Sequence, residues 1–422
     1  MTKVVCIVGL GTVGKELLVL CHKKGYTVRG YDIDEKQVML INSQLNSYIA
    51  FTDLEKAING AEIIVICVSS SNMGIPDISP VISACKEVSK YLKGGELIII
   101  ESTVPPSSIK SNILPIFKKS LAGEQKKIYL ACCPERLDVG NKKWTIENIP
   151  RVLGGIDEDS VHKAKEFYKC LIDAEIYCVS SPEAAMMTKI IENCFRYLNI
   201  SFVNMLAKCL PSFEFDTEEI LKAASTKPFG FMMFYPGLGV GGECIPLSIH
   251  ILMDMLKDSK CDVSLLINAK KINEGMIYYV KDVLVNLSKK ININTVTVIG
   301  LSYKGGCNIT KNSMAFRLIS LLKGLGDRFE IYRYDHRQPN ISDFADINDV
   351  LRYSDCLIIA NNDPVWSKVF SSYNLKHSNV KCIIDCYGVI DEKDLMSKLQ
   401  ILYWRLGKSK MKMGGDYNYE YA

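Results

Sequence analysis

The sequence predicts an α/β fold with two doubly wound, parallel-sheet domains joined by a central helical domain. A strand, a glycine-rich turn and a helix follow one another from residue 4 onward, and a weaker series of the same kind begins near residue 295. Between the two, residues 183–210 and 262–290 are long and apolar at helical spacing. The chain has 422 residues, more than one hydrophobic core usually serves, so about two or three domains are expected.

The N-terminal run VVCIVGLGTVG predicts a buried strand and a glycine-rich turn, and KELLVLCHKKG continues as a helix. The turn has GxGxxG spacing, and we expect a pyrophosphate at the helix N-terminus to contact Gly9, Gly11, Thr12, Val13 and Gly14. The next strand, YTVRGYD, ends at Asp32, roughly 20 residues on. This carboxylate can accept hydrogen bonds from both ribose hydroxyls but would repel a 2′-phosphate. A Rossmann domain that binds NAD rather than NADP is therefore predicted; the alternative is a purely structural turn.

The rest of the first sheet follows in apolar, strand-like runs. They are AEIIVICVS (61–69), ELIIIEST (96–103), KIYLACCPE (127–135) and RVLGG (151–155). Helical runs separate the early ones, and this alternation is typical of a doubly wound parallel sheet.

A second series repeats this order of elements in weaker form. Its runs are TVTVIGLSYKGG (295–306), the helical SMAFRLISLLKGLG (313–326), FEIYRYD ending at Asp335, SDCLIIANN (354–362) and KCIIDCYG (381–388). Only Gly300 of the fingerprint remains. A second dinucleotide is therefore not expected, whereas a nucleotide half such as a UDP moiety would suit a Rossmann-like sheet of this kind.

These sections predict four parts of the chain. They are an NAD-binding Rossmann domain over 1–180, a central helical domain over 181–290, a Rossmann-like domain over 291–405, and a flexible tail over 406–422. The tail is assigned because its sequence lacks periodicity. The central helices are of the kind that often forms a subunit interface; the alternative is that they only brace the two sheets.

Composition excludes several classes of protein. The chain is 48% hydrophobic and 23% charged, with a net charge of +4 and no basic block, so no nucleic-acid partner is expected. No apolar run is long enough to span a membrane. Of the 16 cysteines, Cys6, Cys67 and Cys382 lie inside strand-like runs, which indicates a reduced, cytoplasmic protein. Without a CxxC pair or an HExxH motif, no metal site is predicted.

The segment from Thr226 to Ser248, TKPFGFMMFYPGLGVGGECIPLS, carries the most chemical information. It places Cys244 directly after four glycines in six positions, Gly237, Gly239, Gly241 and Gly242. Backbone N–H groups in such a loop can approach an anion closely, and a thiol beside it suggests covalent catalysis on a phosphorylated or nucleotide-linked substrate. The alternative is a glycine-rich surface loop followed by a buried cysteine.

Further candidates lie outside this segment. Lys189 and Asn193 stand at i, i+4 on one helix face, where they could donate two hydrogen bonds to an oxyanion; a surface lysine is the alternative. Thr103 and Glu135 each follow a predicted strand, at the sheet edge where doubly wound folds bind ligands. Each of these two could instead be a helix cap or a solvated loop residue.

Several motifs in order resemble those of one family. They are GLGTVG with Asp32, ESTVPP (101–106), CPERLDVGN (133–141) with IPRVLGG (149–155), KIIENCFRYLNISFVN (189–204), TKPFGFMMFYPGLGVGGECIP (226–246) and GLSYKGG (300–306). Over about residues 1 to 405 the chain resembles the UDP-glucose/GDP-mannose dehydrogenase family, most closely its UDP-N-acetylglucosamine 6-dehydrogenase branch. The resemblance implies an N-terminal NAD domain, a helical centre that forms a homodimer or higher homo-oligomer, and a C-terminal UDP-binding domain.

The resemblance also implies a four-electron oxidation of the sugar 6-hydroxyl of a UDP-N-acetylhexosamine, with two NAD used in turn and a thiohemiacetal and thioester on Cys244. In this comparison Lys189 and Asn193 stabilise oxyanions, while Glu135 and Thr103 handle protons and water. Thr103 and Lys304 would also contact the cofactor. The substrate-binding positions are Glu135, Arg136, Lys189, Asn193, Lys227, Phe231, Tyr235, Gly237, Gly241, Tyr303 and Lys304. Such an enzyme serves nucleotide-sugar metabolism and polysaccharide biosynthesis.

The chain departs from the family pattern at four positions. Ser248 stands where the family has an aspartate that helps to activate water, and Glu243 replaces the usual His or Ser before the cysteine. Asn308 and Lys311 occupy positions that usually hold acidic residues and an arginine. Serine is no carboxylate base, and an acidic neighbour would raise the pKa of a thiol, so thioester hydrolysis is the step placed in question.

Three functions therefore remain open from the sequence. The first is an active UDP-N-acetylhexosamine 6-dehydrogenase, with UDP-glucose or UDP-N-acetylmannosamine as alternative substrates. The second is a nucleotide-sugar-binding homologue with impaired catalysis, for which Ser248 argues. The third is a two-electron hydroxyacid dehydrogenase, against which the cysteine loop and the third domain argue.

Overall fold

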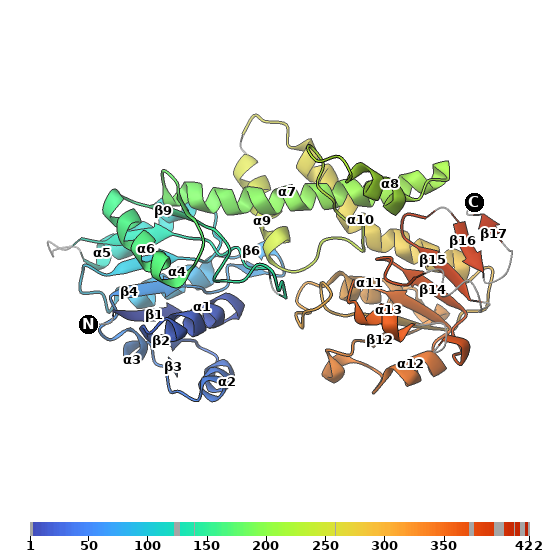
Figure 1. Cartoon of the computed structure of the whole chain (residues 1–422), viewed down its shortest axis with the longest axis horizontal. Coiled ribbons are helices and arrows are strands. Elements are labelled where there is room, and N and C mark those ends of the chain that lie inside the picture. Colours follow the sequence, from blue (N-terminus) through green and yellow to red (C-terminus); the bar gives the residue numbers. More distant parts are fainter. Residues whose placement is uncertain are drawn as a thin grey trace. The chain divides into compact units, whose positions relative to one another are not determined.

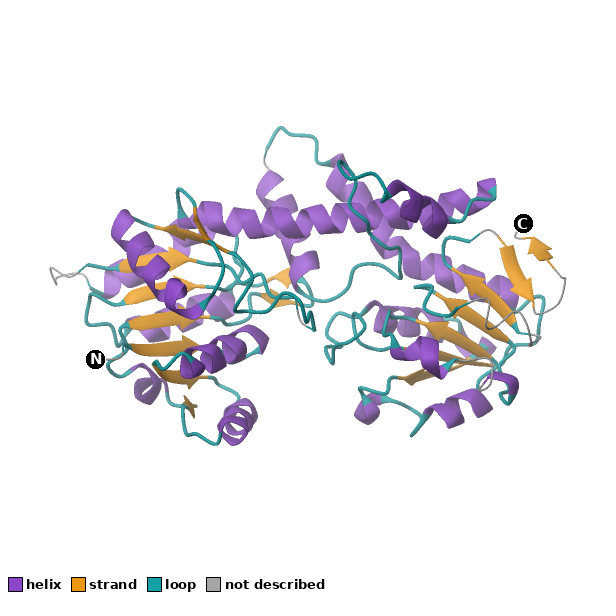
Figure 2. Cartoon of the chain, in the orientation of Figure 1, coloured by secondary structure: helices purple, strands orange, loops and turns teal. Residues whose placement is uncertain are grey.

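The computed structural model describes residues 3–121, 127–138, 140–257, 259–370, 375–391, 401–408, 410–413 and 418–420. Residue contacts divide the chain into two compact units, Met1–Asn193 with His250–Asp258, and Cys194–Ile249 with Ser259–Ala422. Each unit contains one large sheet with helices beside it (Figures 1 and 2). The fold class predicted from the sequence is confirmed, and the boundaries at 180, 290 and 405 stay predictions.

The first unit is built on an eight-stranded sheet. In spatial order its strands are β10 Ile176–Cys178, β9 Arg151–Gly155, β8 Tyr129–Cys132, β7 Leu97–Ile100, β4 Ile63–Ile66, β1 Val4–Val8, β2 Thr27–Tyr31 and β3 Ala50–Phe51. A small hairpin pairs β5 Ser71–Asn72 with β6 Ile75–Pro76. The order turns back beside β1, which makes the carboxyl end of β1 the topological switch point where such sheets bind ligands.

Alternate residues of these strands enter two different cores. Val5 and Ile7 of β1 pack with α1, α2 and α6 on one face, while Cys6 and Val8 pack with α3, α4 and α5 on the other. The helices are α1 Thr12–Lys23, α2 Glu35–Leu45, α3 Leu54–Ile58, α4 Ser79–Ser89, α5 Leu114–Ser120, preceded by a π-helical turn Ile109–Ile113, and α6 Glu158–Leu171. Because both faces are covered, the central strands read as continuous apolar runs, which is why they could be located from the sequence.

The sheet is not parallel throughout. β9 runs antiparallel to β8, with Cys132 opposite Gly154, and β10 runs parallel to β9. The reversal follows from the connection, since the described residues between the two strands, 133–138 and 140–150, contain no crossover helix. As a result, the first residue of β9, Arg151, lies at the same edge as the last residues of β7 and β8.

Two helices have residues in both units. They are α7 Pro182–Cys209, the long helix in Figure 1, and α9 Cys244–Leu256, which begins at the cysteine singled out above. No helix in the described part of the chain is long and apolar enough to cross a membrane.

The second unit contains a seven-stranded sheet. Its strands in spatial order are β12 Glu330–Tyr334, β11 Thr295–Ile299, β13 Cys356–Ile359, β14 Cys382–Asp385, β15 Leu402–Arg405, β16 Lys410–Met413 and β17 Asn418–Glu420. One face packs against α10 Ser264–Leu287 and α11 Met314–Lys323, and the other against α12 Ile347–Tyr353 and α13 Val365–Val369. The remaining elements are α8 Thr217–Ala224 and the 3₁₀ turns Leu210–Phe213, Gly326–Arg328 and Pro339–Ile341.

Strands β16 and β17 lie in the segment 406–422, for which a flexible tail was expected. They pair antiparallel with each other, and β16 pairs with β15. A pairing edge offered by the preceding strand can order a sequence that lacks its own periodicity. Positions 409, 414–417 and 421–422 of this segment lie outside the described residues.

Side-chain caps define where many helices begin. Among the described residues, six helices start after an Asp or Ser whose side chain accepts a first-turn N–H: α2 after Asp34, α3 after Asp53, α6 after Asp157, α8 after Asp216, α11 after Ser313 and α12 after Asp346. Helix α1 instead follows Gly11, which offers no side-chain cap, and its first turn carries no acidic residue.

Candidate functional site

The glycine loop after β1 has the geometry of a dinucleotide cradle. Gly9 has φ +90° and donates its N–H to the Tyr31 carbonyl at 2.8 Å, which turns the chain sharply off the strand. A Cβ on Gly14 would collide with the carbonyl oxygen of Gly9, so the helix can approach the loop only with glycine there. A Cβ on Gly11 would meet no atom within 4 Å. The first-turn N–H groups of α1, near Thr12 and Val13, thus face an open position that fits a pyrophosphate.

Asp32 lies directly beyond the end of β2 and beside this loop. Its Oδ2 accepts the Leu10 N–H at 2.7 Å and its Oδ1 accepts the Asp34 N–H at 2.9 Å. These two bonds fix the carboxylate at the switch-point edge of the sheet. The position fits the ribose-binding role expected from the sequence.

Thr103 and Glu135 are found at the carboxyl edge, as their place after predicted strands required. Thr103 is half-buried in the loop after β7, and Glu135 is 7% exposed in the loop after β8. The burial of Glu135 removes the alternative of a solvated loop carboxylate. Its Oε1 accepts the backbone N–H of Arg136 at 2.7 Å, and its Oε2 pairs with Arg151.

Glu135 is one member of a buried group of ionisable side chains that we call the edge cluster: Glu101, Glu135, Arg151 and Tyr168. The Tyr168 hydroxyl donates to Glu101 at 2.5 Å, and Arg151 Nη1 lies 3.5 Å from the same carboxylate oxygen. The side chains of Glu101 and Arg151 are both fully buried. The Arg151 guanidinium also lies over the Tyr168 ring, with Cζ 5.4 Å from its centroid.

Burial and mutual charge shift the pKa values in the edge cluster. Desolvation raises the pKa of Glu101 to about 7, against the lowering influence of Arg151 and with a further increase from Glu135. Burial by itself lowers the pKa of the Arg151 guanidinium, but the neighbouring carboxylates of Glu135 and Glu101 raise it, and the net pKa is raised. Burial also raises the pKa of the Tyr168 hydroxyl well above its usual range.

Glu101 and Arg151 are candidate functional residues that the sequence alone does not identify. Both lie in motifs that carry the family resemblance, ESTVPP and IPRVLGG, but the resemblance implies no role for either. The signal that could have found them is a charged residue next to an apolar strand run: Glu101 follows the apolar run of ELIIIEST, and Arg151 begins RVLGG. Their proximity could not be predicted, because it depends on the antiparallel placement of β9.

Arg136, expected to bind substrate, is engaged within the first unit. Its Nε donates to Glu192 Oε2 at 3.2 Å, its Nη2 lies 2.6 Å from Glu192 Oε1, and its Nη1 donates to the Pro150 carbonyl at 2.9 Å. Glu192 belongs to α7, next to the candidate donors Lys189 and Asn193. On that helix Lys189 is half-buried and Asn193 is 4% exposed, and their spacing puts both on one face.

Cys244 is exposed and forms the first residue of α9. This corrects the alternative of a buried structural cysteine after the glycine loop. The thiol therefore lies at the surface, at the end of the helix where the first-turn N–H groups have no partners within the helix.

The glycines before Cys244 are required by packing within the second unit. Gly242 has φ +77°, and a Cβ there would lie 2.9 Å from the Tyr303 ring. Gly241 lies against the Asn312 carbonyl, and Gly237 against the Tyr387 ring. These three positions need glycine because the loop packs closely against other residues of the same unit. This packing is a reason for the glycines that is separate from phosphate binding.

Hydrogen bonds fasten the same loop at two places. The Gly242 N–H donates to the Asn312 carbonyl at 3.1 Å, and Asn312 Nδ2 returns a bond to the Gly242 carbonyl at 2.6 Å. At the other end, the Gly237 N–H donates to Asn204 Oδ1 at 2.8 Å, and Asn204 donates to Asn273 at 2.9 Å. These bonds connect the cysteine loop to α7 and α10.

The departures from the family pattern have a structural context. Glu243 and Lys311 form an ion pair of 2.5 Å, so a positive charge compensates the carboxylate next to the thiol. Ser248 is fully buried, and its hydroxyl donates to the Cys244 carbonyl at 2.9 Å within α9. Asn308 contributes its carbonyl, which accepts a bond from Gln338 at 2.5 Å.

The other substrate-binding candidates of the second unit are arranged along two segments. Lys227 Nζ lies 4.7 Å from the Phe229 ring centroid, Phe231 is half-buried, and Tyr235 is 61% exposed. In the turn after β11, Lys304 Nζ lies 5.8 Å from the Tyr303 ring centroid. Tyr303 thus contacts both the cysteine loop and the lysine.

The turn after β11 copies the first unit without forming a second cradle. Gly300 has φ +86° and Asp335 accepts the Leu301 N–H at 2.7 Å, as Gly9 and Asp32 do in the first unit. However, Asp335 is only 1% exposed, and a Cβ on Gly305 would run into the backbone of Asn362 and Asp363. Asp335 is therefore less accessible to a ligand than the half-buried Asp32 of the first unit.

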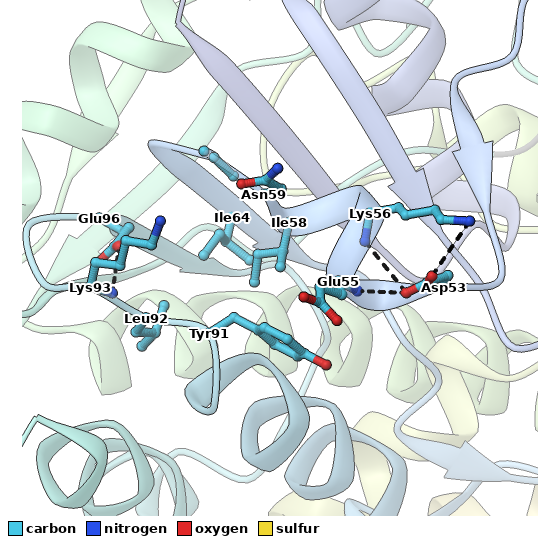
Figure 3. Close-up of a pocket in the computed structure, with 12 residues that line it drawn as sticks. Asp53, Glu55, Lys56, Ile58, Asn59, Ile64, Tyr91, Leu92, Lys93 and Glu96 are labelled. Atoms are coloured by element: carbon cyan, nitrogen blue, oxygen red, sulfur yellow. Dashed lines mark hydrogen bonds and ion pairs between the residues drawn. The ribbon is translucent and has the colours of Figure 1, made fainter.

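A cavity of about 450 Å³ lies away from this site, in the first unit. Its lining includes Asn59, Tyr91 and Glu96, from segments that precede β4 and β7 (Figure 3). The amino ends of strands are opposite the ligand-binding edge, so the cavity lies outside the candidate site. No group of three or more His, Cys, Asp or Glu side chains in the described residues could hold a metal ion.

Comparison with known proteins agrees with this geometry. The model of the UDP-glucose/GDP-mannose dehydrogenase family NAD-binding domain matches residues 40–172, and that of its central domain matches residues 183–275. The UDP-N-acetyl-D-mannosamine dehydrogenase of Methanocaldococcus jannaschii is 30% identical, over 94% of this chain and 93% of the relative. The UDP-N-acetyl-D-glucosamine 6-dehydrogenase of Pseudomonas aeruginosa is 29% identical, over 78% of this chain and 82% of the relative.

A solved structure extends the comparison to the fold. The UDP-D-ManNAc dehydrogenase of Pyrococcus horikoshii superposes with a TM-score of 0.85 and 26% identity, covering 96% of this chain and all of that one (100%). The matched family models and the near full-length relatives show that the chain belongs to the UDP-glucose/GDP-mannose dehydrogenase family and carries its NAD-binding domain.

Proposed function

We propose that this protein is an NAD-dependent UDP-sugar 6-dehydrogenase that oxidises the C6 hydroxyl of a UDP-N-acetylhexosamine to the carboxylate. The observation that carries the proposal is Cys244, exposed at the first residue of α9 at the end of a closely held glycine loop. A two-electron hydroxyacid dehydrogenase would have no use for such a thiol.

In the proposed reaction, bound NAD supplies the oxidising power, one hydride acceptor for each of two oxidations. Gly9, Gly11 and Asp32 are the residues that would hold it. After the first oxidation, the Cys244 sulfur bonds to C6 of the aldehyde and the carbonyl electron pair moves to oxygen. Oxidation of this thiohemiacetal gives a thioester, and water breaks the S–C6 bond to release the acid and the thiol.

The roles of the other residues follow from where negative charge and protons develop. Lys189 and Asn193 share one face of α7, so both can donate to the oxyanion of each tetrahedral species; losing one such donor typically costs roughly 2.7–4 kcal/mol of barrier. Glu135, a buried carboxylate at the sheet edge, is the proposed proton acceptor, with Thr103 orienting water. Lys227, Phe231, Tyr235, Tyr303 and Lys304 would hold the UDP-sugar.

The experiment that tests the proposal is NADH formation from a panel of UDP-sugars. The expected substrate is a UDP-N-acetylhexosamine, and the panel must separate UDP-N-acetylglucosamine, expected from the sequence, from UDP-N-acetylmannosamine, after which several relatives are named. UDP-glucose and a galactosamine relative complete it. If the protein binds a UDP-sugar tightly but forms no NADH from any, the function is that of a binding subunit.

Ser248 favours that second function, because no carboxylate stands one turn after the thiol. If the enzyme is active but Ser248 slows hydrolysis, a burst of two NADH per site should precede slow turnover, with an acyl adduct on Cys244. If Glu135 supplies the base, there is no burst, and Glu135→Gln should lower kcat by about 10²–10⁴-fold.

We also propose a cytoplasmic homodimer or higher homo-oligomer. Helix α7 exposes a row of large apolar side chains: Phe195 is 48%, Phe202 50% and Met205 37% exposed. Side chains of this size at i, i+7 and i+10 form one stripe, typical of a helix that packs against another chain. Light scattering after gel filtration tests this, and a monomer at micromolar concentration would contradict it.

A further inference from the structure

The antiparallel direction of β9 places the positively charged Arg151 at the carboxyl edge of the sheet, where a parallel β9 would not place it. Since β9 is antiparallel to β8, its first residue Arg151 lies at the carboxyl edge of the sheet, beside Glu101 after β7 and Glu135 after β8. One buried guanidinium therefore faces two carboxylates that arrive on different strands. Nothing assigned to the proposed reaction so far uses Arg151 or Glu101.

Arg151 is shared unequally between the two carboxylates. Its Nη1 makes a close ion pair with Glu135 Oε2 but lies 3.5 Å from Glu101 Oε1. The Arg136 N–H donates to Oε1 of Glu135, while Oε2 has no hydrogen-bond partner among the described residues and is held by the ion pair with Arg151 alone. Arg151 Nε and Nη2 have no hydrogen-bond partner among the described residues. The polar contacts that the structure gives this guanidinium are therefore those of Nη1 with the two carboxylates of the edge cluster.

The net charge of the edge cluster determines which protonation state of Glu101 is favoured. With Glu101 protonated, the buried charges are one guanidinium and one carboxylate, and they cancel. With Glu101 ionised, a net negative charge remains in a site without solvent, which is costly. Burial raises the pKa of Glu101 to about 7, in agreement with the balanced state.

We propose that Arg151 positions Glu135 for its role in the oxidation, and that Glu101 retains a proton so that the guanidinium charge is directed to Glu135. This inference rests on the proposed function, because Glu135 matters only if the protein handles protons of a UDP-sugar substrate.

The groups that face Glu101 come from every element packed around it. They are Arg151 of β9, Tyr168 of α6, Glu135 and Cys133 after β8, Cys67 after β4 and Cys21 of α1. Cys67 Sγ lies 3.8 Å from Glu101 Oε2, and burial raises the pKa of this thiol well above its usual range. The cysteines and Tyr168 thus stay neutral, and Arg151 and Glu135 are the charges that Glu101 responds to.

A double-mutant cycle on the full-length protein tests the positioning. Glu135→Gln is expected to lower kcat by about 10²–10⁴-fold. Arg151→Lys keeps the charge but misplaces it, with an expected loss of about 10²-fold in kcat and little change in KM. In the Glu135→Gln background the same change should cost less than about threefold, because its effect acts through Glu135. Full additivity of the two losses overturns the proposal.

A second experiment, on Glu101→Gln, tests the proposal even if Arg151→Lys fails to fold. Glu101→Gln fixes this position in the neutral state, so its kcat profile should lose the change near pH 7 that ionisation of Glu101 gives the wild type. The two profiles should run together below about pH 6 and separate above it. Glu166→Gln removes the same charge from an exposed site on α6 and serves as the control. If the ratio of the kcat of Glu101→Gln to that of the wild type is the same at every pH, the proposal is overturned.

The outcomes separate the two levels of the account. A wild type without NADH formation overturns the proposed function and the positioning with it. An active wild type with an additive cycle overturns the positioning alone and leaves the proposed function intact.

Discussion

At the scale of single residues, the carboxylate of Asp32 shows how one side chain can serve both fold and ligand. It closes the glycine loop by accepting the Leu10 N–H at 2.7 Å, and it remains at the edge where a ribose would lie. The same carboxylate also restricts the cofactor, since a 2′-phosphate would be placed against a fixed negative charge.

Replacing Asp32 by Ser should therefore narrow the preference for NAD over NADP. A charge-assisted hydrogen bond contributes roughly 1.5–3 kcal/mol, so we expect the ratio of kcat/KM values to fall by about tenfold or more. Asp34→Asn is the matched control, because it removes a charge two residues away and keeps a cap acceptor for the Lys36 N–H. An unchanged ratio in Asp32→Ser would show that this carboxylate does not face the ribose.

Glu101 makes stability depend on pH in an unusual direction. Its pKa is raised to about 7 in the folded protein from an ordinary value of 4.5, so between these values the folded state holds a proton that the unfolded chain has lost. This contribution to stability is complete below about pH 4.5 and is lost as the pH rises through 7.

The denaturant midpoint measures this effect without any turnover. The wild type should lose stability between pH 5 and 7.5 relative to Glu101→Gln, whose side chain does not titrate. Parallel curves for the two proteins would show that Glu101 is ionised throughout in the folded state.

At the scale of elements, the cysteine loop and α9 act as one clamped piece. Bonds from Asn312 and Asn204 hold the two ends of the loop, and the Glu243–Lys311 pair holds the residue before the thiol. Much of the position of Cys244 is thus determined by the turn after β11 and by helices α7 and α10, far away in sequence.

Gly242→Ala tests this clamp. Its φ of +77°, and the Tyr303 ring 2.9 Å from where the alanine Cβ would lie, leave the substituted residue without a relaxed position, at a cost on the order of 1–3 kcal/mol. We expect lower thermal stability and a loss of activity larger than the loss of UDP-sugar binding.

Gly275→Ala is the matched control for that change. Gly275 lies inside α10 with no atom within 4 Å of a Cβ, so alanine there should stabilise the helix by about 0.5–1 kcal/mol. Equal effects of the two substitutions on Tm and activity would contradict the clamp.

At the scale of the whole molecule, strand and helix order could be read from the sequence because both faces of each sheet are covered. Apolar runs such as IIVI of β4 and CLII of β13 have no polar face to obscure them. The glycine fingerprint and Asp32 were located for a related reason, since their spacing is local.

What could not be predicted depends on non-local pairing. The direction of β9 follows from a loop connection, and it alone places Arg151 beside Glu101 and Glu135. The compensation of Glu243 by Lys311 likewise joins residues that are distant in sequence. Strand β16 pairs with β15, and β17 pairs with β16, and neither pairing could be inferred from the composition of the segment.

The proposed function requires a four-electron oxidation through the thiol of Cys244. It is tested most directly by counting NADH formed per UDP-sugar consumed, in the wild type and in Cys244→Ser. We expect two NADH and one uronic acid per sugar in the wild type, and no acid from Cys244→Ser with UDP-sugar binding retained. One NADH per sugar with an aldehyde product, or acid formation by Cys244→Ser at an ordinary rate, would contradict it.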